Sequence, residues 1–190
     1  MRLPRIVKTE DGSLTYFNEE FDQIYHSKSG AIEESFKKYV EPCNITDGMT
    51  IVDYCFGLGY NALAAMAVCD NLTVYALEID AKLMANLEEL TFTELIGYEP
   101  HIKNRLERFF VEMAQKLKQH IDTGETEFTF TVGTSIMHML IGDAVETLTK
   151  VPAEAVDAIF WDPFSPKPHP ELWTQCEFKK AYTVLKKGGI

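Results

Sequence analysis

The sequence predicts an α/β fold in which a mostly parallel, twisted sheet carries helices on both faces. Three observations lead to this prediction. An apolar strand at 50–54 runs through a glycine loop into an alanine-rich helix, and a second strand at 72–77 ends in an acidic residue before another helix. An apolar run at 156–161 then ends at an Asp-Pro pair. Strands that alternate with helices in this way join through right-handed crossovers and form a parallel sheet.

The first half of the chain gives these elements in order. The first ~30 residues are expected to form an irregular or hairpin arm with a turn at Asp11-Gly12. Apolar residues spaced as on one helix face predict a helix from Gly30 to Val40. After the first strand, a helix is expected from Tyr60 to about Val68, and after the second strand a helix that runs to about Leu95.

The second half continues with a long helix from Pro100 to Gly124, which is expected either to pack on the sheet or to form a wall of the substrate site. Residues 128–132 alternate like an exposed strand, and 137–141 are expected to form the next strand of the sheet. The run 156–161 is apolar throughout, which is typical of a buried central strand. A last helix is predicted from Leu172 to Leu185.

Composition fits one soluble globular domain. The 190 residues are enough for a single sizeable core, and no stretch approaches the roughly 20 apolar residues of a membrane helix. The N-terminus has no apolar signal region, so a cytoplasmic location is expected. The four cysteines are scattered without the spacing of a metal site, so we expect reduced thiols and no bound metal.

The net charge of −11 argues against a strong nucleic-acid binder. Local clusters matter more than the sum, however. Basic residues gather in four places, which are either solvated surfaces or contacts for a nucleic acid: Arg2/Arg5/Lys8, Lys103/Arg105/Arg108, Lys116/Lys118 and Lys179/Lys180/Lys186/Lys187.

A glycine loop at 53–59 joins the first strand to its helix. Gly57 and Gly59 allow the backbone to approach a ligand closely. The following helix presents unpaired N–H groups and a positive dipole end, which suit the carboxylate of an amino-acid-like cofactor. We therefore expect Asp53, Gly57, Gly59 and Asn61 to belong to a cofactor site.

Acidic residues follow the second and third strands. Glu78 ends the second strand about 20 residues after the glycine loop, where an acid commonly binds the ribose hydroxyls of a nucleotide. Asp80 is the alternative for this role. Asp143 can accept a hydrogen bond from the exocyclic amine of adenine, and it can also cap the next helix.

Asp162 ends the apolar run, at the edge where open α/β sheets bind ligands. The chain continues as Pro163-Phe164-Ser165-Pro166, a stiff loop that places an aromatic ring beside the acid. This arrangement suits a flat base that carries an amine. Trp161 faces either this site or the core.

These motifs, in this order, are similar to those of Rossmann-like class I S-adenosylmethionine-dependent methyltransferases. Two segments, FDQIYHSKSGAIEES (21–35) and DAIFWDPFSPKPHPELWT (157–174), resemble the methyltransferase domain of the MnmC family, which acts in tRNA 5-methylaminomethyl-2-thiouridine biosynthesis, and its stand-alone relatives. The resemblance covers nearly the whole chain. Residues 1–190 are therefore expected to form one such domain, with an N-terminal arm and helix at 1–45 and a Rossmann-like core at 46–190 that lacks its last strands.

The resemblance implies that a methyl group passes from S-adenosylmethionine to the amine of 5-aminomethyl(-2-thio)uridine at the tRNA wobble position. It implies that Asp162 orients the amine and takes its proton, which agrees with the chemistry because an amine attacks only when it is neutral. Phe164 is expected to stack on the base or face the sulfonium, and Lys167 to meet phosphate. Tyr25 and His26 are expected to cover the cofactor.

Two features depart from the family pattern. Cys55 stands where the glycine loop usually has its first glycine, and the family continues beyond Ile190 through a further strand, a helix and a hairpin. A second chain or a dimer mate is one way to complete the sheet. Three alternatives stay open: methylation of another amine, aminopropyl transfer of the spermidine synthase type, and a cofactor-binding subunit that needs a partner chain.

Overall fold

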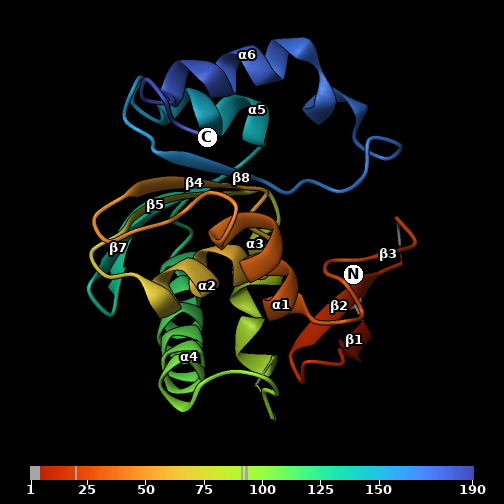
Figure 1. Cartoon of the computed structure of the whole chain (residues 1–190). Coiled ribbons are helices and arrows are strands. Elements are labelled where there is room, and N and C mark those ends of the chain that lie inside the picture. The colour runs from red at the N-terminus through yellow and green to blue at the C-terminus, as the bar shows by residue number, and fades with distance from the viewer. Residues whose placement is uncertain (1–4, 20, 91, 93) are drawn as a thin grey trace.

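The computed structural model describes residues 5–19, 21–90, 92 and 94–190. Its centre is a five-stranded sheet in the order β6-β7-β5-β4-β8 (Figure 1). β6 (Glu127–Val132) is antiparallel to its neighbour. The other strands run parallel to one another: β7 (Ser135–Ile141), β5 (Thr73–Glu78), β4 (Thr50–Tyr54) and β8 (Ala158–Trp161). The expected mostly parallel sheet is confirmed.

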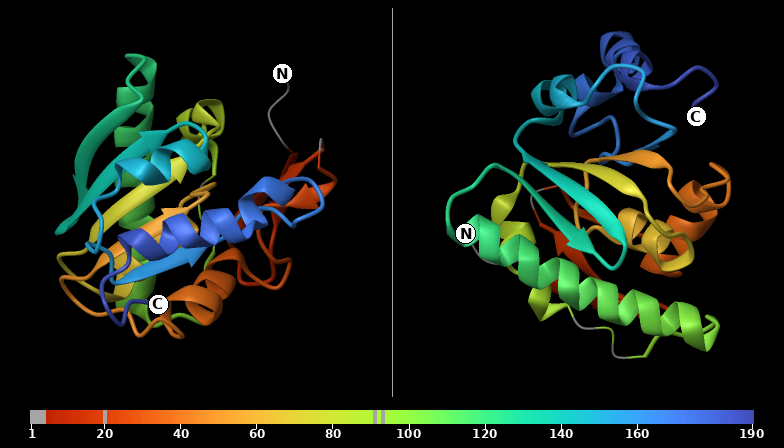
Figure 2. Two further views of the ribbon diagram at one scale, coloured as in Figure 1. Left: turned by 90° about the horizontal axis from the view of Figure 1, so that it is seen from above. Right: turned by 90° about the vertical axis from the view of Figure 1, so that its left-hand side faces the viewer.

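Helices cover both faces of this sheet, as predicted (Figures 1 and 2). One face carries α1 (Ala31–Ser35), the π-helical turn η1 (Phe36–Val40), α2 (Tyr60–Val68), α3 (Ala81–Ala85) and α4 (Pro100–Asp122). The opposite face carries α5 (Ala144–Thr147), the 3-10 turn η3 (Leu148–Lys150) and α6 (Gln175–Val184). Each face has its own apolar core.

Sequence patterning explains the two helices that build the larger core. α2 is apolar on nearly every side, and it is buried because it lies between the sheet and α4. α4 begins with Pro100 in its first turn, where the missing N–H has no helical partner in any case. Its inward face is one stripe at helical spacing, which includes Leu106, Phe110 and Met113. The expected long helix is confirmed.

The strand order places the loops that follow the parallel strands at one edge. The chain passes from β4 to β5 and β7 on one side, and it returns with β8 on the other. The order therefore reverses between β4 and β8, which is the point where open α/β sheets bind ligands.

The N-terminal arm forms a small antiparallel sheet beside that edge (Figure 2). It consists of β1 (Arg5–Lys8), β2 (Leu14–Asn18) and β3 (Gln23–Ile24). The expected hairpin and its turn at Asp11-Gly12 are confirmed. The Tyr60 hydroxyl donates to the Leu14 carbonyl oxygen at 2.5 Å, which ties the arm to α2.

The helix predicted after β5 is shorter than expected. α3 ends at Ala85, a 3-10 turn, η2 (Leu87–Glu89), follows, and the prediction that the helix reaches Leu95 is wrong. The helix stops where Asn86 leaves the helical conformation, with φ of −112° and ψ of 11°. Further along the chain, the Ile96 amide donates to the Asp11 carbonyl oxygen at 2.9 Å, which ties the segment after η2 to the arm.

Two predictions for the last part of the chain also need correction. The run 156–161 was expected in the centre of the sheet, but β8 is its outermost strand within the described residues. One edge of β8 pairs with β4, and on the other edge the Ile159 amide donates to the Ile190 carbonyl oxygen at 2.8 Å, next to an isolated bridge between Val156 and Leu185. Its apolar side chains are buried by helices packed on the two faces. The last helix begins at Gln175 rather than Leu172, because the Thr174 side chain caps it by accepting from the Glu177 amide. The 3-10 turn η4 (Pro170–Trp173) precedes it.

Every helix in the described ranges is too short or too polar to cross a membrane. The same ranges contain no group of three His, Cys, Asp or Glu side chains that could hold a metal ion.

Candidate active site

A pocket of about 810 Å³ lies at the carboxyl edge of the parallel strands. This volume is in the usual range for small-molecule sites. The lining comes from the arm and from the loops that follow all four parallel strands: residues within 18–26, 55–57, 77–82, 143–144 and 162–172. Segments far apart in the sequence therefore meet at the position that the strand order predicts.

The glycine loop after β4 turns sharply beneath this pocket. Cys55, Gly57 and Gly59 all have left-handed backbone angles, with φ of 65°, 56° and 76°. Gly57 lines the pocket, whereas Gly59 does not. A Cβ at Gly59 would lie 2.4 Å from the Phe56 ring, so this glycine is needed for packing at the start of α2.

Glu78 ends β5 and is held by backbone N–H groups. Its Oε2 accepts from the Gly57 amide at 2.7 Å, and its Oε1 accepts from the amides of Ile79 and Asp80 at 2.9 Å. Burial raises the pKa of Glu78 and these donors oppose the rise. The rival residue Asp80 also lines the pocket, but its Oδ1 caps α3 by accepting from the Leu83 amide at 2.9 Å.

Asp143 fits both interpretations that the sequence left open. Its Oδ1 accepts from the Val145 amide at 2.9 Å and so caps α5. The same exposed residue lines the pocket. An N-cap uses only part of a carboxylate's capacity to accept hydrogen bonds, so the cap leaves room for a ligand.

Asp162 follows β8 and lines the pocket across from Glu78 and Asp143. Its Oδ2 accepts from Nδ2 of Asn61 at 2.9 Å. The Tyr39 hydroxyl, which donates to the Trp161 carbonyl oxygen at 3.3 Å, also interacts with this carboxylate. Burial raises the pKa of Asp162, against the lowering effects of His26, Tyr39 and Asn61. This carboxylate is therefore more basic than an exposed one.

Aromatic side chains join the arm to the loop after β8. The Phe164 ring lies 5.3 Å from the Phe21 ring and 5.0 Å from the Tyr25 ring, measured between centroids. Nε2 of Gln23 donates to the Ser165 hydroxyl at 2.9 Å. Tyr25 also approaches the glycine loop, and burial raises its pKa to about 12. The arm thus closes one side of the pocket.

His26 lies on the arm, buried between its neighbours. Its Nδ1 is 3.3 Å from the Thr15 hydroxyl, and its ring centroid is 5.0 Å from that of Tyr60. Burial lowers the pKa of His26, which favours the neutral ring. The residue lines the pocket together with Tyr25, as the cover expected from the sequence would.

Several predicted site residues lie outside the pocket lining. Asp53 is fully buried and its Oδ2 accepts from the Ala62 amide at 3.1 Å, while Asn61 contacts Asp162 from behind the pocket. Lys167 is exposed on the loop after β8 and forms no ion pair within the described ranges. Trp161 stacks on Tyr54 at 4.0 Å, which assigns it to the core.

Sequence reasoning missed the parts that Phe21 and Tyr39 play in this pocket. Both are ordinary apolar positions when the sequence is read locally. The signal that pointed to Phe21 was its place in the segment 21–35 that resembles the MnmC family. No local signal pointed to Tyr39, whose hydroxyl donates to the carbonyl oxygen of Trp161, the residue before Asp162 and 122 positions along the chain.

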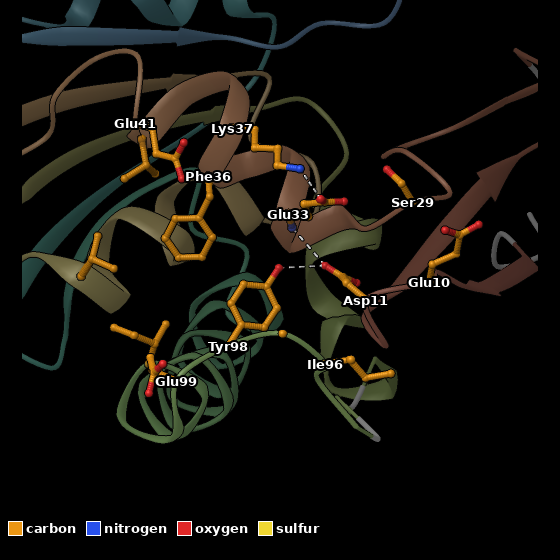
Figure 3. Close-up of a pocket in the computed structure, with 14 residues that line it drawn as sticks. Glu10, Asp11, Ser29, Glu33, Phe36, Lys37, Glu41, Ile96, Tyr98 and Glu99 are labelled. Carbon is orange, nitrogen blue, oxygen red and sulfur yellow. Dashed lines mark hydrogen bonds and ion pairs between the residues drawn. The ribbon is translucent and has the colours of Figure 1, made fainter.

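A second hollow lies between the arm, α1 and the start of α4 (Figure 3). It measures about 660 Å³ and is lined by five carboxylates and one amine, that of Lys37, which is paired with Glu33. Asp11 Oδ2 accepts from the Glu33 amide at 3.0 Å and from the Tyr98 hydroxyl at 3.1 Å. None of its lining residues belongs to the loops that follow the parallel strands, where open α/β sheets bind ligands, so the pocket at the sheet edge remains the candidate site.

Six of the eleven described basic side chains in the four clusters form ion pairs. Arg105 bonds Asp70 and two backbone carbonyl oxygens, and Lys186 bonds Asp157 at 2.8 Å. Four further lysines pair with acids on their own helices: Lys103, Lys116, Lys118 and Lys180. Arg2 lies outside the described residues. Solvated, paired surfaces are the interpretation that these contacts favour.

Comparison with known proteins shows which enzyme family this chain resembles. A family described as S-adenosyl-L-methionine-dependent methyltransferase matches residues 104–190. An uncharacterized protein of Methanocaldococcus jannaschii is 30% identical over 97% of this chain and 48% of its own length. The tRNA 5-methylaminomethyl-2-thiouridine biosynthesis bifunctional protein MnmC of Leptospira interrogans is 27% identical over 95% of this chain and 28% of its own. The crystal structure of MnmC2 from Aquifex aeolicus matches with a TM-score of 0.69 and 25% identity, over 100% of this chain and 59% of that one.

These findings confirm the resemblance, the enzyme class and the cofactor that the sequence predicted. Residues 104–190 match an S-adenosylmethionine-dependent methyltransferase family, and the chain is similar to MnmC proteins over nearly its whole length. It spans 48% and 28% of the length of the two curated relatives named above.

Proposed function

We propose that this S-adenosylmethionine-dependent methyltransferase domain methylates the amine of 5-aminomethyl(-2-thio)uridine at the wobble position of tRNA. The observation that carries the proposal is the position of Asp162. Its partly buried carboxylate lines the same pocket as Glu78 and Asp143, beside the ring of Phe164. The names of the MnmC relatives support this nucleoside as the substrate.

The pocket residues suit S-adenosylmethionine. Glu78 would accept hydrogen bonds from the ribose hydroxyls, because the three N–H donors that hold it leave part of its capacity to accept hydrogen bonds unused. Asp143 would accept from the exocyclic amine of adenine. The glycine loop at Gly57 would pass close to the methionine part, while Asp53 and Gly59 would shape that loop from behind. The cofactor supplies the sulfonium methyl group.

Asp162 would accept the proton that the substrate amine loses. As the N–C bond forms, the S–C bond of the sulfonium breaks and S-adenosylhomocysteine leaves. The nitrogen then carries a positive charge and must lose a proton, which the Asp162 carboxylate is placed to accept. Its raised pKa makes it a better acceptor than an exposed aspartate.

The arm and the loop after β8 would hold the uridine. Phe164 offers a ring face for stacking on the base, and Phe21 and Tyr25 support that ring. Lys167 would contact a phosphate near the mouth. In this proposal the arm with the first helix, 1–45, and the core, 46–190, act as one domain, because the arm closes the pocket that the core builds.

The test is a methyl-transfer assay with labelled S-adenosylmethionine, this chain, and tRNA that carries 5-aminomethyluridine. Unmodified tRNA is the control, and decarboxylated S-adenosylmethionine tests for aminopropyl transfer. Label that enters only the modified tRNA is the expected result. Cofactor binding without any label would overturn the proposal for this chain alone, and would favour another amine substrate or a required partner chain.

A complementary pair of variants separates chemistry from cofactor binding. Asp162→Ala should retain affinity for S-adenosylmethionine within about threefold and lose a hundredfold or more in kcat, because it removes the proton acceptor. Glu78→Ala should weaken cofactor binding by about tenfold or more, since it removes a charged hydrogen-bond acceptor. Calorimetry and single-turnover rates measure the two effects. Full turnover in Asp162→Ala would remove this residue from the mechanism, and unchanged affinity in Glu78→Ala would move the ribose role to Asp80.

A further inference from the structure

Glu177 is a buried carboxylate behind the pocket, on the face of the sheet that carries α5 and α6 (Figure 1). It lies in the first turn of α6 and is 2% exposed. Its Oε1 accepts from the Tyr54 hydroxyl at 3.1 Å, and its Oε2 pairs with Nζ of Lys180 at 3.0 Å. Each carboxylate oxygen therefore holds one side chain.

Stability alone does not explain a carboxylate at this position. Ala181 and Val184 of the same helix pack in the smaller apolar core, where an apolar side chain at position 177 could also be buried. Removing a charged pair from water costs about as much free energy as the attraction within the pair returns. The two partners of Glu177 therefore have to indicate what the carboxylate contributes.

The first partner, Tyr54, lies directly behind the glycine loop. It is the last residue of β4 and precedes Cys55, the first residue of that loop to line the pocket. Tyr54 is 0% exposed and its ring stacks on Trp161. The hydroxyl bond to Glu177 thus fixes the end of β4 at the point where the chain enters the glycine loop.

The second partner, Lys180, connects α6 to α5. Its Nζ also donates to the Val145 carbonyl oxygen at 3.2 Å. Val145 follows Asp143 and Ala144, which line the pocket, and its amide donates to Oδ1 of Asp143 at 2.9 Å. Through Lys180, Glu177 therefore holds the turn that carries Asp143.

We propose that Glu177 is a positioning residue for the cofactor site, which fixes the loops after β4 and β7 through Tyr54 and Lys180. These loops would hold the methionine part and the adenine of S-adenosylmethionine. A site whose loops are fixed in advance loses less conformational entropy on binding, so the contribution of Glu177 should appear in cofactor affinity. This role rests on the cofactor contacts proposed above for Gly57 and Asp143, and it does not depend on which amine accepts the methyl group.

Calorimetry with the whole chain and S-adenosylmethionine, without tRNA, tests the role of Glu177. Glu177→Leu should raise Kd about tenfold, because both contacts are lost. Glu177→Gln should recover part of the affinity, since its amide oxygen can still accept from Tyr54. Thermal melts and the binding stoichiometry establish the folded fraction of each variant. An unchanged Kd in folded Glu177→Leu would overturn the proposal, and if that variant does not fold, an unchanged Kd in both Glu177→Gln and Tyr54→Phe would do so.

Adenosine, which lacks the methionine part, separates the two contacts of Glu177. Lys180→Met loosens the turn that carries Asp143, so it should weaken adenosine and S-adenosylmethionine by a similar factor of about three. Tyr54→Phe keeps the ring that stacks on Trp161 and removes only the hydroxyl, so it should weaken S-adenosylmethionine more than adenosine. The opposite pattern would contradict the assignment of Tyr54 and Lys180 to different ends of the cofactor.

Tyr98→Phe is the matched control for Tyr54→Phe. The Tyr98 hydroxyl also donates to a carboxylate at 3.1 Å, that of Asp11, but Tyr98 does not line the cofactor pocket. This variant should lower the melting temperature and leave Kd for S-adenosylmethionine in place. Equal losses of affinity in Tyr98→Phe and Tyr54→Phe would assign the effect to general destabilisation and overturn the positioning role.

Turnover gives a second readout that a purely structural role would not move in this way. Glu177→Leu should raise KM for S-adenosylmethionine and keep kcat within about threefold at saturating cofactor, because it removes binding that is not specific to the transition state. A fall in kcat at an unchanged KM would contradict the role at the cofactor. If the wild type transfers no methyl group to tRNA, the proposed function fails, whereas the cofactor affinities still decide the role of Glu177.

Discussion

At the scale of single residues, the loop after β4 combines two different demands on the backbone. Cys55 adopts a left-handed conformation, with φ of 65°, at the position where the family pattern has glycine. A side chain there costs roughly 1–2 kcal/mol, and Cys55 tolerates it because its side chain packs at the edge of the smaller core. Gly59, four residues later, has no space for a side chain at all.

A matched pair of glycines separates backbone strain from steric exclusion. Gly59 and Gly48 have nearly the same φ, 76° and 77°, but a Cβ at Gly48 meets nothing within 4 Å. Gly48→Ala should therefore lower the free energy of unfolding by about 1 kcal/mol from strain alone. Gly59→Ala should cost about 2–4 kcal/mol, because the Phe56 ring and Met113 must also move. Urea denaturation measures the free energy of unfolding of both variants. Equal losses of this free energy would show that the loop repacks around the new side chain at Gly59 without cost.

The residues that could be predicted from sequence are those whose roles follow from a strand end. Glu78, Asp143 and Asp162 each follow a parallel strand, and parallel strands end at one edge, so their meeting could be inferred without coordinates. The contact between Asn61 and Asp162 joins residues 101 positions apart and depends on how α2 packs against β8. No local pattern contains that information, which is why Asn61 was expected at the cofactor instead.

At the scale of elements, the arm and the first helix are joined by one buried carboxylate. α1 begins after Gly30, which has no side chain to cap it. Asp11 supplies the cap from the arm by accepting from the Glu33 amide, and it also accepts from Thr9, Ser13 and Tyr98. A Cβ at Gly30 would lie 2.5 Å from Asp11, so the glycine makes room for a cap from another element.

Asp11→Asn should therefore weaken the junction between the arm and α1. An amide offers one acceptor oxygen where the carboxylate offers two, so we expect a loss of about 1–3 kcal/mol in the free energy of unfolding at pH 7. Burial alone would raise the pKa of Asp11, but the hydrogen bonds from Ser13, Glu33 and Thr9 outweigh it and lower the pKa. The contribution is then present above the ordinary carboxyl pKa, and it is lost as the pH falls through the lower folded value.

The variant and the wild type should thus converge in stability as the pH falls below about 4. Thermal melts from pH 7 to pH 2 measure the difference. A gap that stays constant over this range would show that Asp11 acts through packing and not through its charge.

The helix predicted to reach Leu95 ends at Ala85, and the chain that follows it is bonded to the arm at this same junction. Residues after η2 have an apolar pattern that is compatible with a helix, yet the Ile96 amide bonds to Asp11 of the arm. A single sequence does not show whether a backbone amide will bond within a helix or to a hairpin some 80 positions earlier in the chain. The strands and α2, by contrast, match their patterns because each contributes a continuous apolar run to a core.

At the scale of the whole molecule, a net charge of −11 must be reconciled with the proposed tRNA substrate. Six of the eleven described basic side chains in the four clusters pair with acids. The five that form no ion pair within the described ranges lie outside the pocket lining: Arg5, Lys8, Arg108, Lys179 and Lys187. Lys167 is an exposed, unpaired cation on a loop that also lines the pocket, within the ranges that the structure describes. Binding of tRNA should therefore depend on a small footprint near the pocket and only weakly on salt.

The salt dependence of tRNA binding tests this expectation. A plot of log K for tRNA binding against log salt concentration should be shallower than about −3, since each phosphate contact contributes slightly less than one unit. Lys167→Ala should weaken binding and reduce the slope by about 1. Lys118→Ala, on α4 where the lysine is paired with Asp122, is the matched control and should change neither quantity. A steep slope for the wild type would contradict this expectation, and so would an equal loss of tRNA affinity in Lys118→Ala. Either result would place the tRNA on the face that carries α4 instead of at the pocket. The uridine would then have to reach Asp162 from that face.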